Sequence, residues 1–264
     1  DPLWSRGLGD VYKRQDKYPV VYVTDAGSNF IGLMGSLPLM QFVNDLPSFV
    51  LVGIDYKSPN SMDSMSLRNR DLTPTNDEIW MAAQKDMYKI FGEDLPQVEA
   101  GGAKYFLDFI NDEIKPFINK KYYVDTTDQT YCGFSLGGLF GLYTLFNSSD
   151  SFKRYVIGSP WICWDYPLCF DYEKKYSENH EDLNDIVYMA TGGDEHILYP
   201  NLPDPIVPLF KEAKTEEYSR KMFKLIESRN YPNLNFRGKI IDDETHFTMV
   251  SSLIGKGLKS VFNQ

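Results

Sequence analysis

The sequence has few of the residues from which metal sites and disulfide scaffolds are built, with three histidines and three cysteines among 264 residues. Cys132, Cys163 and Cys169 are an odd number too small for a disulfide framework, and their spacing is not that of a zinc site. We therefore expect no metal centre. The sequence also lacks an apolar run of about 18 residues, so it predicts no membrane-spanning helix.

Basic residues are in the minority as well: 27 Lys and Arg stand against 37 Asp and Glu, for a formal net charge of −10. A nucleic-acid binder needs a basic face to neutralise phosphates, so this balance argues against nucleic acid as a partner. Aromatic residues make up 15% of the chain, which excludes global disorder. The length fits one domain with a sizeable core.

The first fifteen residues, DPLWSRGLGDVYKRQ, show neither a strand period nor a helical period. Their last six letters match the translation of an adapter used in preparing sequencing libraries. We therefore expect residues 1–15 to be an artefact, with the native sequence starting near Asp16 and its N-terminal strands and any export signal missing. The alternative is a genuine disordered terminus. The cellular compartment stays unassigned on either interpretation.

Short runs of β-branched and aromatic residues alternate with segments of helical periodicity along residues 16–264. This alternation predicts an α/β fold in a single domain, with a mostly parallel sheet and helices on both of its faces. The predicted strands are 18–23, 49–54, 130–134, 155–158, 185–190 and 236–241, and the predicted helices are 103–119, 137–146, 209–229 and 248–262.

Other segments carry weaker patterns. Residues 24–29 have the composition of a turn-rich loop. Residues 55–102, rich in Ser, Asn, Asp and Met, are predicted to be mostly irregular, which in a compact domain is typical of a functional loop or lid. Pro116 is expected to kink or end the helix at 103–119. We expect 209–229 to be one charged, solvent-facing helix.

Residues 133–137 fit the pattern G-x-S-x-G between a predicted strand and a predicted helix. In such a nucleophile elbow a sharp turn projects the serine hydroxyl, and the two glycines remove Cβ atoms that would clash. The N–H of Leu136 would then lie at a helix N-terminus, where donors lack partners and negative charge is favoured. The motif alone is weak, but its strand–turn–helix context makes Ser135 a strong candidate nucleophile. A dinucleotide-binding loop is disfavoured because the spacing is not G-x-G-x-x-G.

A hydrolase built on this elbow needs an acid and then a histidine further along the chain. His246 follows the last predicted strand, so we expect it to be the general base. His180 lies in a polar loop and is expected at the surface, whereas His196 is expected to be a neighbour of the pocket. Asp194 and Glu195 both follow the strand at 185–190, and either could orient the imidazole.

With these residues identified, the chain resembles the putative esterase family of α/β-hydrolases, the group that contains esterase D and the enterochelin esterase-like enzymes. The resemblance extends from about residue 18 to the C-terminus and implies the α/β-hydrolase fold. Family members carry their acid in a G-x-x-E turn, which points to Glu195. The resemblance rests on residues 18–25, 52–55, 70–74, 101–118, 133–140, 159–160 and 164–165.

The resemblance implies a serine ester hydrolase that works through an acyl-enzyme on Ser135, with neither a metal nor an organic cofactor. Leu136 would give one N–H of the oxyanion hole. Many relatives have Asp-Gly in the oxyanion loop, but this chain has Asp25-Ala26-Gly27. Both Ala26 and Gly27 therefore remain candidates for the second donor.

Aromatic residues and arginines near these motifs are candidates for substrate binding, with Arg70, Trp161 and Trp164 foremost. Arg68 and Trp80 are carried on the same loop as Arg70. Each aromatic could equally pack a loop against the core. Small-molecule esters of the siderophore class or carbohydrate-linked aromatic esters are the substrates that the resemblance suggests. The alternatives are an acyltransferase of the same fold and a non-catalytic binding module.

Overall fold

The computed structural model describes residues 17–57, 62–92, 99–166, 168–197 and 199–263. Residues 1–15, expected to be an artefact, lie outside this range. The described strands form one sheet in the order β2-β1-β3-β4-β5-β6, and every neighbouring pair is parallel. This sheet confirms the predicted α/β fold. The strands are β1 (Tyr18–Thr24), β2 (Val50–Ile54), β3 (Val124–Phe134), β4 (Arg154–Gly158), β5 (Ile186–Gly192) and β6 (Asn235–Ile241).

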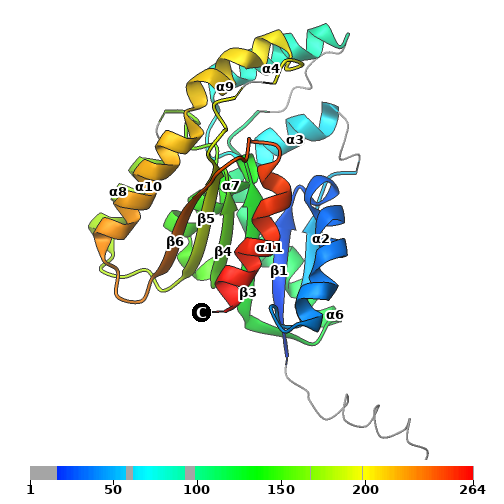
Figure 1. Cartoon of the computed structure of the whole chain (residues 1–264), viewed down its shortest axis with the longest axis vertical. Coiled ribbons are helices and arrows are strands. Elements are labelled where there is room, and N and C mark those ends of the chain that lie inside the picture. Colours follow the sequence, from blue (N-terminus) through cyan, green and yellow to red (C-terminus); the bar gives the residue numbers. More distant parts are fainter. Residues whose placement is uncertain (1–16, 58–61, 93–98, 167, 198, 264) are drawn as a thin grey trace, which may run out of the picture.

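Helices cover both faces of the sheet because successive strand residues point to opposite sides. On β1, Val20 and Tyr22 belong to one buried cluster, and Val21 and Val23 belong to the other. The helices α2 (Ala26–Phe42) and α11 (Met249–Phe262) cover the face of Val21, where they lie side by side (Figure 1). The opposite face carries α5 (Ala103–Phe109), α6 (Lys115–Lys121), α7 (Leu136–Asn147), α8 (Leu168–Asn179) and α10 (Thr215–Arg229).

Most predicted strands agree with the structure to within two residues at either end. The exception is β3, which begins at Val124 rather than at residue 130. Its early residues, such as Thr126 and Thr127, are exposed and polar, so they do not show the β-branched apolar run that predicts a buried strand. Their pairing with β1 crosses an irregularity in register between Tyr18 and Val20.

The expectation that residues 55–102 are mostly irregular was wrong, because α3 (Met62–Leu72) and α4 (Glu78–Ile90) lie in this segment. Apart from Leu72, the buried positions described in α3 are polar, so the apolar helical period is missing. The Ser66 hydroxyl lies 2.8 Å from the Tyr88 hydroxyl of α4. The side-chain amide of Asn69 on α3 also bonds Gln84 of α4. Polar contacts therefore join α3, which hydrophobic periodicity does not detect, to α4, which also buries Met87 and Tyr88.

Three further expectations about helices need correction. The loop expected at 24–29 ends at Asp25, because α2 begins at Ala26. The single helix expected at 209–229 is two, α9 (Val207–Ala213) and α10, separated by Lys214 in the left-handed conformation. The helix at 103–119 contains a π-helical turn, η1 (Ile110–Ile114), directly before α6. Pro116 lies just after this turn, and Ile114 and Lys115 before it keep helical backbone angles, so the proline does not end the helix.

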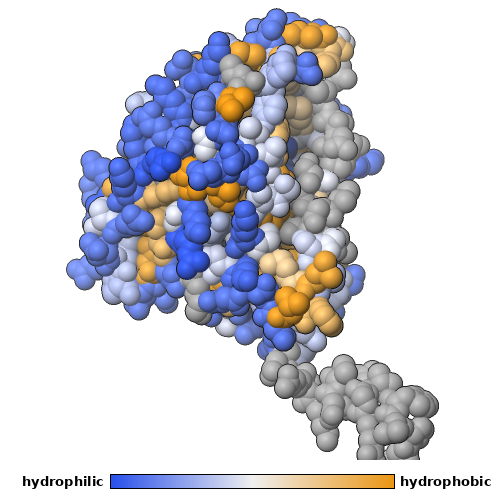
Figure 2. Space-filling view, in the orientation of Figure 1, coloured by the Kyte–Doolittle hydropathy of each residue, from blue (hydrophilic) through white to orange (hydrophobic). Residues whose placement is uncertain are grey.

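The carboxyl ends of the strands form the edge of the sheet beneath α3, α4 and α9 (Figure 1). Ligands of open α/β sheets bind at this edge. Figure 2 shows one group of hydrophobic residues at the C-terminal end of α2, at the opposite edge, where Leu39, Phe42 and Val43 are exposed. Six polar residues at or just beyond the strand ends are Asp25 (β1), Asp55 (β2), Ser135 (β3), Ser159 (β4), Glu195 (β5) and His246 (β6).

Candidate active site

Ser135 occupies a sharp turn between β3 and α7. Its backbone angles, φ 58° and ψ −115°, are unfavourable for a residue that carries a side chain. A Cβ atom on Gly133 would lie 2.3 Å from the Gly137 carbonyl oxygen, and one on Gly137 would lie 2.7 Å from Thr24 Oγ1. Only glycine fits at these two positions, so the G-x-S-x-G pattern forms the tight elbow for which it is required.

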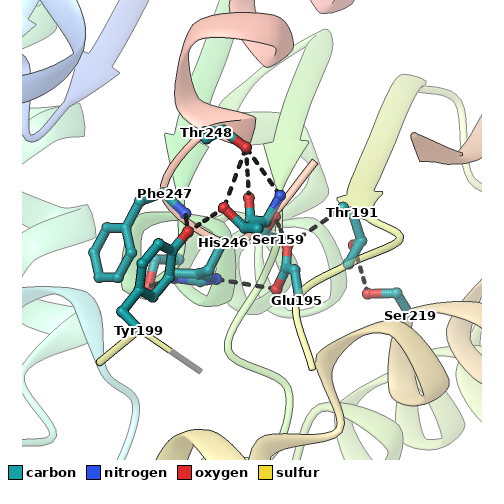
Figure 3. Close-up of polar contacts among 11 residues, drawn as sticks. Ser159, Thr191, Glu195, Tyr199, Ser219, His246, Phe247 and Thr248 are labelled. Atoms are coloured by element: carbon teal, nitrogen blue, oxygen red, sulfur yellow. Dashed lines mark hydrogen bonds and ion pairs between the residues drawn. The ribbon is translucent and has the colours of Figure 1, made fainter. Parts of the chain in front are cut away.

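His246 links the elbow to a buried carboxylate. Its Nε2 lies 3.1 Å from Ser135 Oγ, and its Nδ1 lies 3.0 Å from Oε2 of Glu195. The imidazole and the carboxylate are both almost fully buried, and Figure 3 shows them meeting between the ends of the strands. The three groups have the geometry of a nucleophile, a base and an orienting acid.

The other oxygen of the Glu195 carboxylate also has partners. Oε1 accepts a hydrogen bond from the Ser159 hydroxyl and a second from the Gly192 N–H at 3.1 Å. Asp194, the alternative acid, uses its backbone N–H to bond the Glu244 carbonyl at 2.9 Å and does not reach the imidazole. The structure therefore brings Glu195 to His246.

The loop that carries His246 is fixed by hydroxyl groups. The Tyr199 hydroxyl bonds the Thr245 hydroxyl and accepts the Phe247 N–H at 3.3 Å. The Thr248 hydroxyl accepts the Thr245 N–H at 2.9 Å, as Figure 3 shows in part. These contacts hold both neighbours of His246, so the imidazole is placed by its own loop as well as by Glu195.

Aromatic rings surround the imidazole. The ring centroid of Phe134 lies 4.8 Å from that of His246, and those of Phe247, Phe210 and Trp161 lie at 5.5, 5.6 and 5.7 Å. The backbone N–H of Trp161 also donates to the Ser135 carbonyl oxygen at 3.2 Å. This apolar shell limits rotation of the imidazole and keeps water from its edges.

Ser135 Oγ and His246 open into a cavity of about 260 Å³. A pocket of this size beside the hydroxyl admits an ester group and small substituents. Arg68 is the one arginine or lysine among the described residues that line it. The other lining residues are Asp25, Asp55, Tyr56, Met65, Phe134, Phe247 and Val250.

Two helix N-termini meet at this cavity. Leu136 is the first residue of α7 and Ala26 is the first residue of α2, so the N–H group of each lacks an acceptor within its own helix. The Gly27 N–H, the other candidate donor, donates instead to the Asp55 carboxylate.

The expected substrate-binding residues have different surroundings. Arg70 forms a two-pronged ion pair with Asp71, at 2.6 and 3.0 Å, and does not line the cavity with Ser135. Trp164 is fully buried, and its indole N–H donates to the Thr75 carbonyl at 3.2 Å. Trp161 is the one that contacts the imidazole. Arg70, which the sequence suggested as a substrate-binding residue, therefore does not line the cavity, whereas Arg68 does.

Ser159 was not recognised as a site residue from the sequence, although it directly follows the predicted strand at 155–158. The two other histidines, His180 and His196, are exposed, and neither lines the cavity at Ser135. The surface position expected for His180 agrees with this. His196, which was expected to be a neighbour of the pocket, is on the turn that carries Glu195 but forms no described bond with Glu195 or His246.

Cysteine chemistry is disfavoured at this site. Burial raises the pKa of Cys132 and of Cys163 to about 12, so neither thiol is ionised at neutral pH. Across the described residues, no group of three or more His, Cys, Asp or Glu side chains is arranged to hold a metal ion. None of the helices that the structure describes is long and apolar enough to cross a membrane.

A parallel sheet with a serine elbow, a histidine and an acid at its carboxyl edge defines an α/β-hydrolase. The model of the family described as "Putative esterase" matches residues 7–200, which is more than half of the chain. The chain therefore belongs to this esterase family. The match includes Ser135 and Glu195, whereas His246 lies beyond it.

Curated relatives carry esterase names. The chain is 36% identical over 157 residues to the ferri-bacillibactin esterase BesA of Bacillus subtilis, which covers 57% of this chain and 50% of that protein. It is 33% identical over 150 residues to the siderophore enterobactin esterase of Emericella nidulans, which covers 55% of this chain and 46% of that protein. The chain thus spans about half the length of these relatives.

The fold is shared with solved structures. The siderophore hydrolase EstA from Aspergillus nidulans matches with a TM-score of 0.75 at 21% identity, and the match covers 93% of this chain and 82% of that one. Identity at this level shows a common fold. The α/β-hydrolase architecture expected from the sequence is therefore confirmed.

Proposed function

We propose that this protein is a serine carboxylic-ester hydrolase in which Ser135 is the nucleophile, His246 the general base and Glu195 the orienting acid. The observation that carries the proposal is the 3.1 Å approach of His246 Nε2 to Ser135 Oγ on a strained elbow. A serine hydroxyl is a weak nucleophile at its free pKa and needs an adjacent base to attack a carbonyl carbon. The position of His246 supports its assignment as that base.

In the acylation step, Ser135 Oγ attacks the ester carbonyl carbon while its proton passes to Nε2 of His246. Glu195 holds the Nδ1–H and stabilises the imidazolium that results. The tetrahedral intermediate collapses when its bond to the leaving oxygen breaks, and His246 returns the proton to that oxygen. The products of this step are a free alcohol and an ester between Ser135 and the acyl group.

In the deacylation step, water takes the place of the serine oxygen. His246 accepts a proton from the water as its oxygen attacks the acyl carbon, and then gives the proton back to Ser135 Oγ. The carboxylic acid leaves and the free enzyme is restored. The apolar rings around the imidazole support this cycle, because they offer no other proton acceptor. Proton transfer is therefore confined to Ser135, the attacking water and His246.

The oxyanion of each tetrahedral intermediate needs N–H donors. We assign these to Leu136 and Ala26, whose N–H groups begin two helices at the same cavity. The dipoles of both helices favour negative charge at that point. Occupation of the Gly27 N–H by Asp55 supports Ala26 as the second donor. A single donor of this kind is worth on the order of 10²–10³ in kcat.

The substrate class that we propose is the ester bond of a siderophore. BesA is named as an esterase of ferri-bacillibactin, and the Emericella relative as an esterase of enterobactin. Relatives from two different genera are thus both named as siderophore esterases. This agreement supports siderophore esters as the substrate class of this chain. The particular siderophore is left to experiment.

The test is hydrolysis of p-nitrophenyl acetate and butyrate by the wild type and by Ser135→Ala. We expect release of p-nitrophenol by the wild type and loss of at least about 10³-fold in kcat for the variant. Treatment with diisopropyl fluorophosphate should release fluoride and add one phosphoryl group, located by mass spectrometry at Ser135. Equal rates for the two proteins, or labelling elsewhere, would refute the assignment.

A second assay addresses the substrate. Cleavage of iron-loaded and iron-free catecholate siderophores should be followed by chromatography beside a feruloylated sugar ester. Preference for the siderophores supports the proposed class, whereas preference for the sugar ester overturns it. An excess of sugar acceptor in the same assay reports acyl transfer, because a new ester would form in place of the free acid.

A further inference from the structure

Asp25 adopts an unusual conformation at the start of the oxyanion loop. Its φ of 53° and ψ of 45° lie in the left-handed region, which is sparsely populated by residues other than glycine. A residue at the N-cap normally accepts a hydrogen bond from the first turn of its helix, but the Asp25 side chain makes no such bond with α2. A left-handed non-glycine residue persists only where its surroundings hold it.

Arg68 of α3 holds Asp25 in this conformation. Its Nε donates to Oδ1 of Asp25 at 2.6 Å and its Nη2 donates to Oδ2 at 2.9 Å. The pair is largely buried, with 25% of the Arg68 side chain and 12% of the Asp25 side chain exposed. Two parallel bonds between a guanidinium and a carboxylate fix orientation as well as distance.

Asp55 caps α2 in place of Asp25. Its carboxylate accepts the Gly27 N–H with Oδ2 and the Tyr56 N–H with Oδ1, the latter at 2.8 Å. Asp55 directly follows β2, whose Ile54 pairs with Thr24 of β1. The first turn of α2 is therefore capped from the neighbouring strand, which leaves the Ala26 N–H as the donor that faces no carboxylate in the described bonds.

The same turn is packed against the nucleophile elbow. The position of a Cβ on Gly137 is 2.7 Å from Thr24 Oγ1 and 3.6 Å from Asp25 Oδ2. The Thr24 hydroxyl lies 3.0 Å from the Tyr131 hydroxyl, which donates to the Gly137 carbonyl oxygen at 2.7 Å. A shift of the Asp25 turn would thus change the distance between the Ala26 N–H and Ser135.

The charges at the cavity also require that Asp25 be paired with Arg68. Asp25 and Asp55 both line it, close to where negative charge develops on the substrate oxygen, and an unpaired carboxylate there would oppose that charge. Burial lowers the pKa of Arg68, but the Asp25 carboxylate, together with Tyr56 and Tyr131, raises it, and the net pKa lies above its ordinary value, so the guanidinium stays charged. Arg68 therefore neutralises the carboxylate nearest to the elbow.

We propose that Arg68, Asp25 and Asp55 are positioning residues of the oxyanion hole, which hold the turn so that the Ala26 N–H faces the tetrahedral intermediate. This inference rests on the proposed ester hydrolysis. The three side chains act through the backbone of residues 25–27 and not on the substrate itself. Arg68 thereby differs from an arginine that binds an acidic group of the substrate.

The test compares Arg68→Gln, Arg68→Lys and Asp25→Asn with the wild type on neutral p-nitrophenyl acetate. We expect Arg68→Gln to lower kcat by about 10–100-fold and to change KM by less than about threefold, because ground-state binding does not use the oxyanion donors. Arg68→Lys keeps the positive charge but cannot form two parallel bonds with the carboxylate. Its kcat should therefore lie between those of the wild type and Arg68→Gln. Asp25→Asn tolerates the left-handed conformation and should lower kcat in the same direction.

A boronic acid that forms a tetrahedral adduct with Ser135 gives an independent readout. Its inhibition constant should rise in parallel with the loss of kcat/KM across the variants. The matched control is Arg229→Gln, which removes an equally two-pronged pair with the buried Glu173, at 2.7 and 2.8 Å, on the far side of the fold. Arg229→Gln should lower the thermal unfolding midpoint without lowering kcat.

Two results would overturn the inference. One is an Arg68→Gln enzyme with wild-type kcat. The other is a variant that keeps its kcat on p-nitrophenyl acetate but shows a higher KM for an ester bearing a free carboxylate, because Arg68 would then bind substrate directly. Failure of the proposed function is distinct from both, since it would appear as a wild type with no more activity than Ser135→Ala.

Discussion

The Ser159 hydroxyl donates a hydrogen bond to Oε1 of Glu195, the carboxylate whose Oε2 faces His246 Nδ1 at 3.0 Å. Both Ser159 and Glu195 are buried. A buried carboxylate needs partners for its remaining lone pairs, or its charged form is disfavoured. Ser159 therefore determines which oxygen of Glu195 is turned toward the imidazole.

Replacing Ser159 with alanine removes this donor and leaves the Gly192 N–H as the described partner of Oε1. We expect kcat/KM for p-nitrophenyl acetate to fall about tenfold, equivalent to about 1.4 kcal/mol in the barrier. Ser219→Ala is the control, because Ser219 is a buried serine that bonds Thr191 at 2.7 Å and does not touch Glu195. A fully active Ser159→Ala enzyme would exclude the role given to this hydroxyl.

The acid of the site is tested by amide substitutions at two adjacent positions. Glu195→Gln preserves shape but can present its NH₂ group to the imidazole, which favours the wrong tautomer, and we expect kcat to fall on the order of 10³–10⁴-fold. Asp194→Asn should stay within about threefold of the wild type, because the Asp194 carboxylate does not reach His246. Steady-state kinetics of both variants show which residue is the orienting acid. If Asp194→Asn lost activity and Glu195→Gln kept it, the acid would be Asp194.

Trp164 is expected to contribute to stability rather than to substrate binding. Trp164→Phe removes the indole donor to the Thr75 carbonyl, which keeps the Thr73 hydroxyl at 3.3 Å, and leaves space where a fully buried indole was packed. The free energy of unfolding in urea should decrease by roughly 1–3 kcal/mol, while KM stays unchanged. Trp161→Phe should instead lower kcat, because Trp161 packs against the imidazole. A change of KM in Trp164→Phe would show that this indole is part of the substrate site after all.

The raised pKa of the buried Asp185 carboxyl group predicts that stability depends on pH. Burial, with a smaller effect of Asp150, raises the pKa of Asp185 to about 8, whereas an aspartate in the unfolded chain titrates near a pKa of about 3.9. The folded state therefore binds a proton that the unfolded state has lost, so the free energy of unfolding decreases as pH rises from about 4 to 8. Burial also lowers the pKa of Lys115, to about 8, so that lysine adds its own pH dependence above this window.

Asp185→Asn removes the titrating group and keeps its shape. Urea unfolding of the variant and the wild type at pH 5 and at pH 8 should show a gain in stability for the variant that is larger at pH 8. The difference between the two proteins isolates Asp185, since every other titrating group is common to both. Parallel pH profiles would mean that Asp185 is ionised in the folded protein at both pH values.

Local patterns were sufficient for much of the fold. Five of the strands and the helix after the elbow follow from runs of β-branched residues and from apolar spacing, because a buried strand or helix face leaves its period in the sequence. The helix α3 left no such trace, since most of its buried positions, among them Ser66 and Asn69, are polar. Hydrogen bonds between helices depend on partners that a single sequence window does not contain.

The candidate site divides in the same way. The G-x-S-x-G elbow is a local motif, so Ser135 and the Leu136 N–H could be predicted from five consecutive residues. His246 followed from the order of elements and from the small number of histidines. Asp194 and Glu195 are neighbours in sequence, and only the direction of each side chain decides which of them meets an imidazole 51 residues further along the chain.

The sequence by itself therefore determined the parallel α/β architecture, the elbow and the esterase family to which the chain belongs, because each of these is encoded in short-range spacing and residue type. Only the tertiary structure decided that Arg68 rather than Arg70 enters the cavity, that Ser159 holds Glu195, and that Asp55 occupies the Gly27 N–H. These contacts join residues up to 43 positions apart. They arise because parallel strands bring their carboxyl ends to one edge, where residues remote in sequence meet.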